Sequence, residues 1–127
     1  MHPKTGRLYV VTKGATAGLY AAPEKLRADA VNVLEPVAAV DARVGLVTAG
    51  DLSSDGKRLV LRNYAEAFVW RVRKGDLGAA LATEPTVVPL PATPQGEAIA
   101  YTADSKALIT TTEDPAGTGA AVFRVPG

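Results

Sequence analysis

The sequence feature that most constrains the fold is a strand–turn–strand pattern that occurs twice, 49 residues apart. Residues 48–64 (TAGDLSSDGKRLVLRNY) align without a gap with residues 97–113 (EAIAYTADSKALITTTE). In both copies two apolar runs flank a turn, which contains Asp55 in the first copy and Asp104 in the second. Short runs rich in Val, Ile, Thr and aromatic residues between such turns are typical of β-hairpins. We therefore expect an antiparallel strand pair in each copy, with the two Asp side chains bonded to nearby backbone.

The pattern extends to a third strand and to a weaker copy near the N-terminus. Residues 68–72 (FVWRV) align with residues 121–125 (AVFRV) at an offset of 53, and residues 4–13 resemble residues 55–64. Periods of about 40–50 residues with several strands each are typical of propeller blades. In this alignment one aromatic residue recurs per copy, and we expect these residues to pack between blades: Tyr20, Trp70 and Phe123.

These patterns predict an all-β chain that forms a partial β-propeller of two to three four-stranded antiparallel blades. The blade repeats cover about residues 1–45, 46–92 and 93–127 of a single domain. We expect three strands in the first repeat, four in the middle one and three in the last, with a short helical turn in residues 74–85. A propeller needs at least about four blades to close its ring. Three partial blades leave open strand edges, which favour association.

Some side chains have a predicted place in this arrangement. We expect Asp51, in mid-strand, to form a hydrogen bond between neighbouring blades. We expect the strand arginines Arg62, Arg71 and Arg124 to lie on exposed faces or to pair with glutamates. The predicted core includes Leu8, Val10, Leu59, Leu61, Trp70, Ile99, Leu108 and Phe123.

Composition and charge exclude several classes of function. The 127 residues include 14 Lys and Arg and 13 Asp and Glu, for a formal charge of +1 and with no basic run, so we expect no nucleic-acid partner. There is no cysteine, which excludes disulfides and thiolate metal sites. The single histidine, His2, lies in a terminus that we expect to be disordered, which argues against a Ser-His-Asp triad. No window approaches the roughly 20 apolar residues of a membrane helix, so we expect no membrane insertion.

The chain resembles a known group of proteins in three segments: residues 2–13 (HPKTGRLYVVTK), residues 50–64 and residues 95–113. They look like the C-terminal part of actinobacterial secreted-type β-propeller proteins, similar to phytase-like and esterase-like propellers. The resemblance implies that residues 95–97 (QGE) open an inner strand and place Glu97 at the mouth of a central channel, in related propellers sometimes as a calcium ligand. The N-terminus lacks a signal-peptide pattern, which indicates a cytoplasmic chain as written, whereas the resembling proteins are secreted. Localisation therefore stays open.

The candidate site consists of three residues that we expect to face the channel: Thr48, Gln95 and Glu97. Only Glu97 is a candidate metal ligand, and we identify no catalytic residue. Calcium takes six to eight oxygen ligands, and the counterpart of Glu97 in the previous copy is Thr48, a weak ligand. The alternative role for Glu97 is structural, with its carboxylate accepting backbone N–H groups where the strand begins.

Three functional hypotheses remain open. In the first, the chain is a non-catalytic propeller segment that acts as an interaction or structural module. In the second, which depends on the resemblance alone, it is a fragment of a calcium-assisted phosphoester or ester hydrolase. In the third, it is a truncated product completed by further copies or a partner chain. We favour the first combined with the third, which needs no cofactor. The hydrolase hypothesis would bring calcium, so whether the chain is an enzyme stays undecided.

Overall fold

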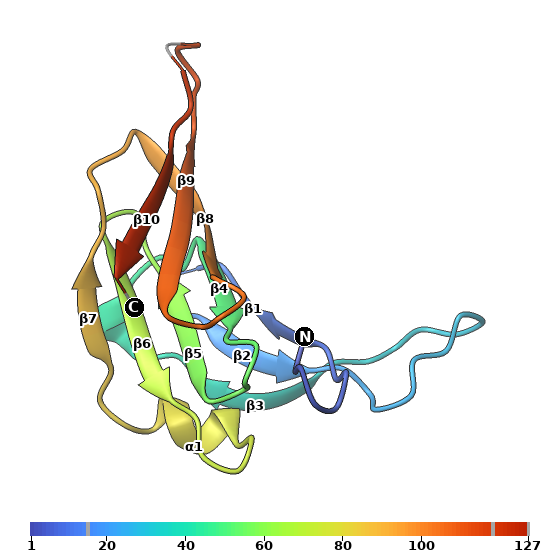
Figure 1. Ribbon diagram of the computed structural model, residues 1–127. Helices are drawn as coiled ribbons and strands as arrows, with labels where there is room; N and C mark the ends of the chain where they lie inside the picture. Colours follow the sequence, from blue (N-terminus) through green and yellow to red (C-terminus); the bar gives the residue numbers. More distant parts are fainter. Residues whose placement is uncertain (15, 118, 127) are drawn as a thin grey trace.

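The computed structural model describes residues 1–14, 16–117 and 119–126, which form three antiparallel β-sheets (Figure 1). The first sheet has the order β1 (Tyr9–Val11), β2 (Gly18–Ala21), β3 (Glu35–Ala39). The middle sheet has the order β4 (Ala49–Leu52), β5 (Arg58–Arg62), β6 (Glu66–Arg71), β7 (Thr86–Pro89). The third sheet has the order β10 (Val122–Pro126), β9 (Ala107–Glu113), β8 (Gln95–Tyr101). The all-β prediction and the strand count of three, four and three are confirmed for the described residues, and the sheets do not close.

A short helix, α1 (Leu77–Leu81), lies between β6 and β7, where residues 74–85 predict a helical turn. It begins at Asp76, whose carboxylate accepts a hydrogen bond from the backbone N–H of Ala79 at 2.9 Å. The helix buries its apolar side chains against β3 and β6, and the indole of Trp70 donates to the carbonyl of Thr83 at 3.0 Å. A 3-10 helix, η1 (Ala42–Val44), precedes β4. Helix α1 closes the lower end of the interface between the first and middle sheets (Figure 1).

The three sheets stack face to face, with the middle sheet between the other two (Figure 1). One face of β5 packs Leu59 and Leu61 in a core cluster with Leu19 of the first sheet. The opposite face packs Val60 in a second cluster with Leu108 of the third sheet. Four successive residues of β5 are consequently buried, 59 to 62, whereas β2 and β10 in the outer sheets alternate between more and less buried residues.

The two outer sheets each keep one face uncovered, and this corrects part of the predicted core. Leu8 and Val10 are 40% and 42% exposed, because no described residue covers that face of the first sheet. Phe123 is half-buried in β10. The other predicted core residues are buried as expected: Leu59, Leu61, Trp70, Ile99 and Leu108.

The strand register reproduces the offset of 49 for two strands and corrects the third. Asp51 pairs with Val60, and the residues 49 positions later, 100 and 109, also pair. On the third strand, however, Phe68 pairs with Leu61 while Phe123 pairs with residue 110, which corresponds to residue 61. Phe123 therefore corresponds to Phe68 and not to Trp70 as the sequence alignment predicts. A shift of two residues keeps every side chain on the same face of a strand, so the apolar pattern does not reveal it.

Hydrogen bonds from side chains join the middle sheet to the third. The carboxylate of Asp51 accepts from the backbone N–H of Tyr101 at 2.8 Å, which confirms the bond expected there. The hydroxyl of Ser54 donates to the carbonyl of Ala103 at 2.8 Å. These bonds run along β4 and the turn after it, so the two sheets are held by polar contacts as well as by the Val60–Leu108 cluster.

Arg62 is a charged residue for which the predicted exposure is wrong. It is 1% exposed, and its guanidinium donates to the carbonyl of Ala98 at 3.1 Å and to the hydroxyl of Thr110. The expectation of an exposed or glutamate-paired arginine fails because β5 is covered on both faces. Burial lowers the pKa of Arg62, yet a guanidinium remains charged in proteins, so these neutral acceptors solvate a buried cation.

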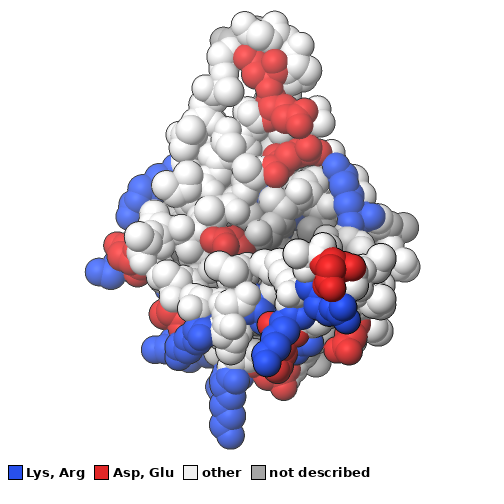
Figure 2. Space-filling view, turned by 90° about the vertical axis from the view of Figure 1, so that its right-hand side faces the viewer, with Lys and Arg blue, Asp and Glu red and all other residues white. Residues whose placement is uncertain are grey.

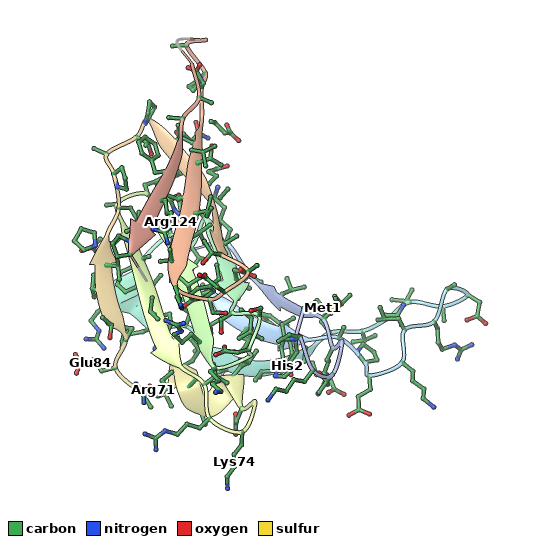
Figure 3. All side chains as sticks on the ribbon, in the orientation of Figure 1. Met1, His2, Arg71, Lys74, Glu84 and Arg124 are labelled. Carbon is green, nitrogen blue, oxygen red and sulfur yellow. The ribbon has the colours of Figure 1, made fainter. Side chains whose placement is uncertain are left out.

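Replacing Arg62 tests whether this cation holds the two sheets together. We expect Arg62→Ala to lower the free energy of unfolding by about 2–4 kcal/mol, because it opens a cavity and removes hydrogen bonds from buried acceptors. The matched control is Arg71→Ala on the neighbouring strand, where the side chain extends into solvent (Figure 3). We expect that control to stay within about 0.5 kcal/mol of the wild type. Urea denaturation measures both, and equal effects would contradict the assigned role.

Gly96 gives a second test, because it lies against the same guanidinium. A Cβ at Gly96 would lie 2.7 Å from the Cζ atom of Arg62, so Gly96→Ala must displace the arginine. We expect Gly96→Ala to destabilise the wild-type chain by about 1–3 kcal/mol and to cost much less in the Arg62→Ala background. A double-mutant cycle measures the coupling, and additive effects would show that the glycine is needed for another reason.

Candidate functional site at the junction of the three sheets

Glu97, the residue singled out in the sequence, lies where all three sheets meet. Its Oε1 atom accepts a hydrogen bond from the Lys13 ammonium at 2.9 Å and from the Tyr64 hydroxyl at 3.0 Å. Glu97 belongs to β8, Tyr64 to the β5–β6 turn and Lys13 to the β1–β2 loop. One carboxylate oxygen thus connects residues 84 positions apart in the chain and one segment from each sheet.

The local structure around Tyr64 explains how the turn presents its ring. The side-chain oxygen of Asn63 accepts from the backbone N–H groups of Ala65 and Glu66 at 2.9 and 2.8 Å, which fixes the turn between β5 and β6. The Lys13 ammonium then lies 6.0 Å from the centroid of the Tyr64 ring, at the outer limit of a cation–π contact. Lysine, tyrosine and glutamate therefore form one closed set of contacts.

The electrostatics of this set favour the charged forms of both ionisable partners. The hydrogen bond from Lys13 holds the pKa of Glu97 below its usual value, and the hydrogen bond from Tyr64 acts in the same direction. The hydrogen bond to Glu97 in turn raises the pKa of Lys13. At neutral pH Glu97 is thus an ionised carboxylate whose charge is balanced by Lys13. It is poorly suited to act as a general base, because a general base needs a pKa near the working pH.

Thr48 and Gln95, the other two predicted site residues, lie beside Glu97. The Thr48 hydroxyl donates to the carbonyl of Gly96 at 3.0 Å, and the backbone N–H of Gln95 donates to the Thr112 hydroxyl at 3.0 Å. The structure therefore brings the three predicted residues together at the junction. Their assignment to a central channel stays a prediction.

The surroundings of Glu97 do not assemble a calcium site from the described residues. In residues 1–14, 16–117 and 119–126 no group of three or more His, Cys, Asp or Glu side chains could hold a metal ion. Calcium needs six to eight oxygens, and the Glu97 carboxylate already accepts two hydrogen bonds. Side chains of the other two sheets donate these hydrogen bonds. We expected backbone N–H groups to be the donors to Glu97. We derive no catalytic step through Glu97.

A cavity of about 270 Å³ adjoins the junction, between β1 and β4. Apolar side chains line most of it, including Val11, Leu59 and Leu61, and Lys13 and Thr48 add polar atoms. Because β1 is an edge strand of three residues, its outer side has no strand partner in the part of the chain that is described. The cavity is therefore bounded on one side by an edge strand.

Sequence reasoning missed Lys13 and Tyr64 as partners of Glu97, although a signal was present. When residues 4–13 are aligned with residues 55–64, Lys13 falls opposite Tyr64. Both residues follow the strand that begins the hairpin, so equivalent loops of neighbouring sheets approach the same point. The pairing with Glu97 could not be read from the alignment, because it depends on how the sheets are stacked.

Comparison of the chain with protein-family models, with curated proteins and with solved structures gave no match. Among the described residues no helix is long and apolar enough to cross a membrane.

The contacts of Glu97 predict a pH dependence with a defined sign. A carboxyl group whose pKa is lower in the folded state contributes stability above its unfolded pKa, and this contribution is lost as the pH falls through the folded pKa. We expect the NMR-measured pKa of Glu97 to lie below 4.5, the ordinary value, and to move upward in Lys13→Gln. The difference in melting temperature between wild type and Lys13→Gln should shrink at pH values below 4.5. Lys106→Gln, at a distant turn, is the control, and an unchanged Glu97 pKa in Lys13→Gln would contradict the prediction.

Proposed function

We propose that this chain is a segment of a β-propeller that serves as a non-catalytic structural and interaction module, completed by further copies of itself or by a partner chain. The observation that carries the proposal is that both outer sheets of the stack have an uncovered apolar face. The four-stranded middle sheet then represents a complete blade, with the two three-stranded sheets as incomplete ones.

The uncovered face of the first sheet is the first support for this proposal. Leu8 and Val10 are exposed there, and the segment between β2 and β3 extends away from the body (Figure 1). The equivalent segment of the middle sheet forms α1 and covers the interface with the first sheet. The β2–β3 segment instead leaves four large apolar residues exposed: Leu26, Val31, Val33 and Leu34. Contiguous exposed apolar surface is typical of an interaction site.

The third sheet supports the proposal from the opposite end of the stack. Its outer face exposes Ile109 and Val122, with the small residues Ala98 and Ala100 beside them. Relative to the middle sheet, the third sheet lacks a strand beyond β10 and the first sheet lacks one before β1. The two missing strands are on opposite sides, so the chain does not supply its own completion.

The structure favours this module over the hydrolase alternative. The hydrolase hypothesis depends on Glu97, whose carboxylate is held by Lys13 and Tyr64. A structural role uses those same contacts directly, because they hold the three sheets in one arrangement.

The proposal predicts self-association through the uncovered faces. We expect the molar mass of the wild-type chain from size-exclusion chromatography with light scattering to rise above that of a monomer as the concentration increases. Val10→Lys should lower the apparent mass at a given concentration, because it places a charge on the apolar face of the first sheet. The matched control is Val87→Lys on the middle sheet. Val87 is also a strand valine, and its exposed fraction of 46% is close to the 42% of Val10.

Two outcomes would contradict completion by further copies. One is a folded wild-type chain that remains a monomer at every concentration. The other is an equal loss of mass in Val10→Lys and Val87→Lys, which would show that added charge acts without regard to position. Circular dichroism of each variant establishes that the strands are intact.

A further inference from the structure

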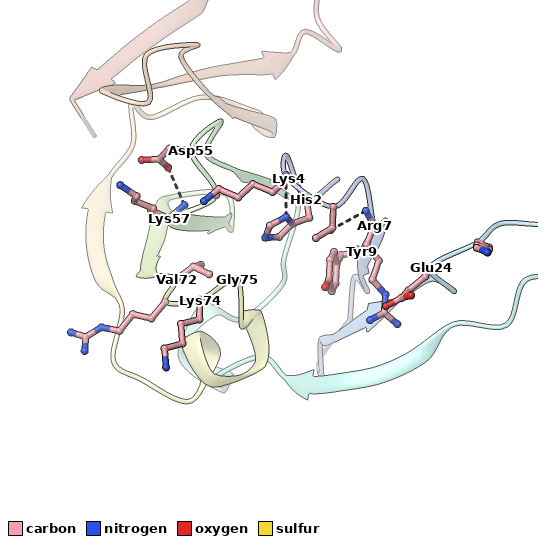
Figure 4. A pocket seen from close by; sticks show the side chains of 14 residues that line it. His2, Lys4, Arg7, Tyr9, Glu24, Asp55, Lys57, Val72, Lys74 and Gly75 are labelled. Atoms are coloured by element: carbon pink, nitrogen blue, oxygen red, sulfur yellow. Dashed lines mark hydrogen bonds between the residues drawn. The ribbon is translucent and has the colours of Figure 1, made fainter.

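A cleft of about 1020 Å³ lies between the N-terminal turn and two turns of the middle sheet (Figure 4). The N-terminal residues 2–7 form one wall, and the β4–β5 turn and the turn after β6 form the other. In an antiparallel sheet these turns lie at the opposite end of β5 from the β5–β6 turn that holds Tyr64. The cleft is therefore separate from the Glu97 junction.

The fold gathers positive charge around this cleft from separate parts of the sequence. Two acidic side chains, Glu24 and Asp55, line it. Six basic side chains line it as well: Lys4, Arg7, Lys25, Lys57, Arg73 and Lys74. The lining thus carries a net charge of +4, counted from these eight residues, against +1 for the whole chain. In Figure 2 most Lys and Arg lie in the lower half, with Asp and Glu among them, while the upper projection shows Asp and Glu.

Most of this charge is not neutralised by ion pairs in the described residues. Arg7 pairs with Glu35 at 3.5 Å. The other five basic side chains that line the cleft have no carboxylate within 4.0 Å among the residues described. The carboxylate of Asp55 is engaged by the Ser53 hydroxyl at 2.7 Å and by the backbone N–H of Lys57 at 2.9 Å. A concave site with an excess of one sign of charge concentrates oppositely charged ligands.

The N-terminal wall of the cleft is an ordered structure, which corrects the expectation of a disordered N-terminus. His2 is 5% exposed, and its backbone N–H donates to the carbonyl of Arg7 at 2.9 Å. Its ring packs so closely on the turns that a Cβ on Gly75 would lie 3.1 Å from its Nε2 atom. Lys74 and Gly75 have positive φ angles of 54° and 74°. This tight turn places the side chains of Arg73 and Lys74 at the rim of the cleft.

We propose that this cleft binds a small polyanion that carries two or more phosphate groups. The size of the hollow and its net charge of +4 fit a compact, multiply charged ligand better than a single phosphate ion. A nucleic-acid duplex is less suited, because the basic side chains come from four segments around one hollow and do not follow an extended stripe.

Inorganic tripolyphosphate is the probe, and isothermal titration calorimetry of the full chain at low salt measures its binding. The sharpest comparison is Lys57→Gln against Lys106→Gln, because both lysines follow equivalent turns. Their backbone N–H groups donate to Asp55 and Asp104 at 2.9 and 3.0 Å, and only Lys57 lines the cleft. We expect Lys57→Gln to weaken binding about three- to tenfold, and Lys57→Gln with Arg73→Gln more strongly still. Lys106→Gln should stay within about twofold of the wild type, and raising the salt should weaken binding.

Several results would overturn the proposal. Absence of heat at low salt is one, and an equal loss in Lys57→Gln and Lys106→Gln is another, since that would show general attraction to a basic protein. Binding of orthophosphate as tight as that of tripolyphosphate would contradict a site for several phosphate groups. Tighter binding of a short DNA duplex than of tripolyphosphate would assign the cleft to nucleic acid. Melting temperatures of the variants without ligand identify any loss that comes from unfolding.

Discussion

The rest of the structure depends on the burial of β5 on both of its faces. Leu59 and Leu61 pack toward the first sheet and Val60 toward the third, so this one strand organises both core clusters. Any polar side chain on a strand that is covered on both sides must find its hydrogen-bond partners inside the protein. The stack of three sheets, the position of Arg62 and the uncovered outer faces all follow from this arrangement.

Arg62 shows what this constraint requires of a charged residue. No acidic side chain pairs with it within the described residues, and backbone carbonyls and the Thr110 hydroxyl accept its hydrogen bonds instead. Gly96 leaves the space that the guanidinium fills. The middle sheet thus binds the third through a combination of apolar packing and a solvated internal cation.

The outer face of the third sheet is chemically different from the corresponding face of the middle sheet. On and beside that face of the middle sheet, Asp51, Ser54 and Arg58 bridge to the third sheet through hydrogen bonds. The residues 49 positions later are all alanine: Ala100, Ala103 and Ala107. A further sheet placed on this face would therefore be held by apolar packing of residues such as Ile109 and Val122 without those polar bridges.

Local chemistry decided the elements that could be predicted from the sequence. Strand-forming runs and Asp-containing turns located the strands, the spacing of Leu77 and Leu81 located α1, and Asp51 was assigned to its bond between sheets. The register of β10 escaped prediction, because a two-residue shift leaves the alternation of faces unchanged. The predicted channel also grouped Thr48, Gln95 and Glu97, but that prediction did not identify the partners of Glu97.

The sequence by itself determined the all-β character, the three-part order of strands and the near-neutral total charge, since these follow from local propensity, turn chemistry and composition. Only the tertiary structure decided which faces are covered, which is why Leu8 and Val10 are exposed while Arg62 is buried. Likewise, only stacking brings lysines from distant segments around His2 into one cleft. The physical reason is the same in each case: burial and electrostatic fields depend on distances between atoms in space, and residues far apart in the chain become neighbours only when the sheets pack.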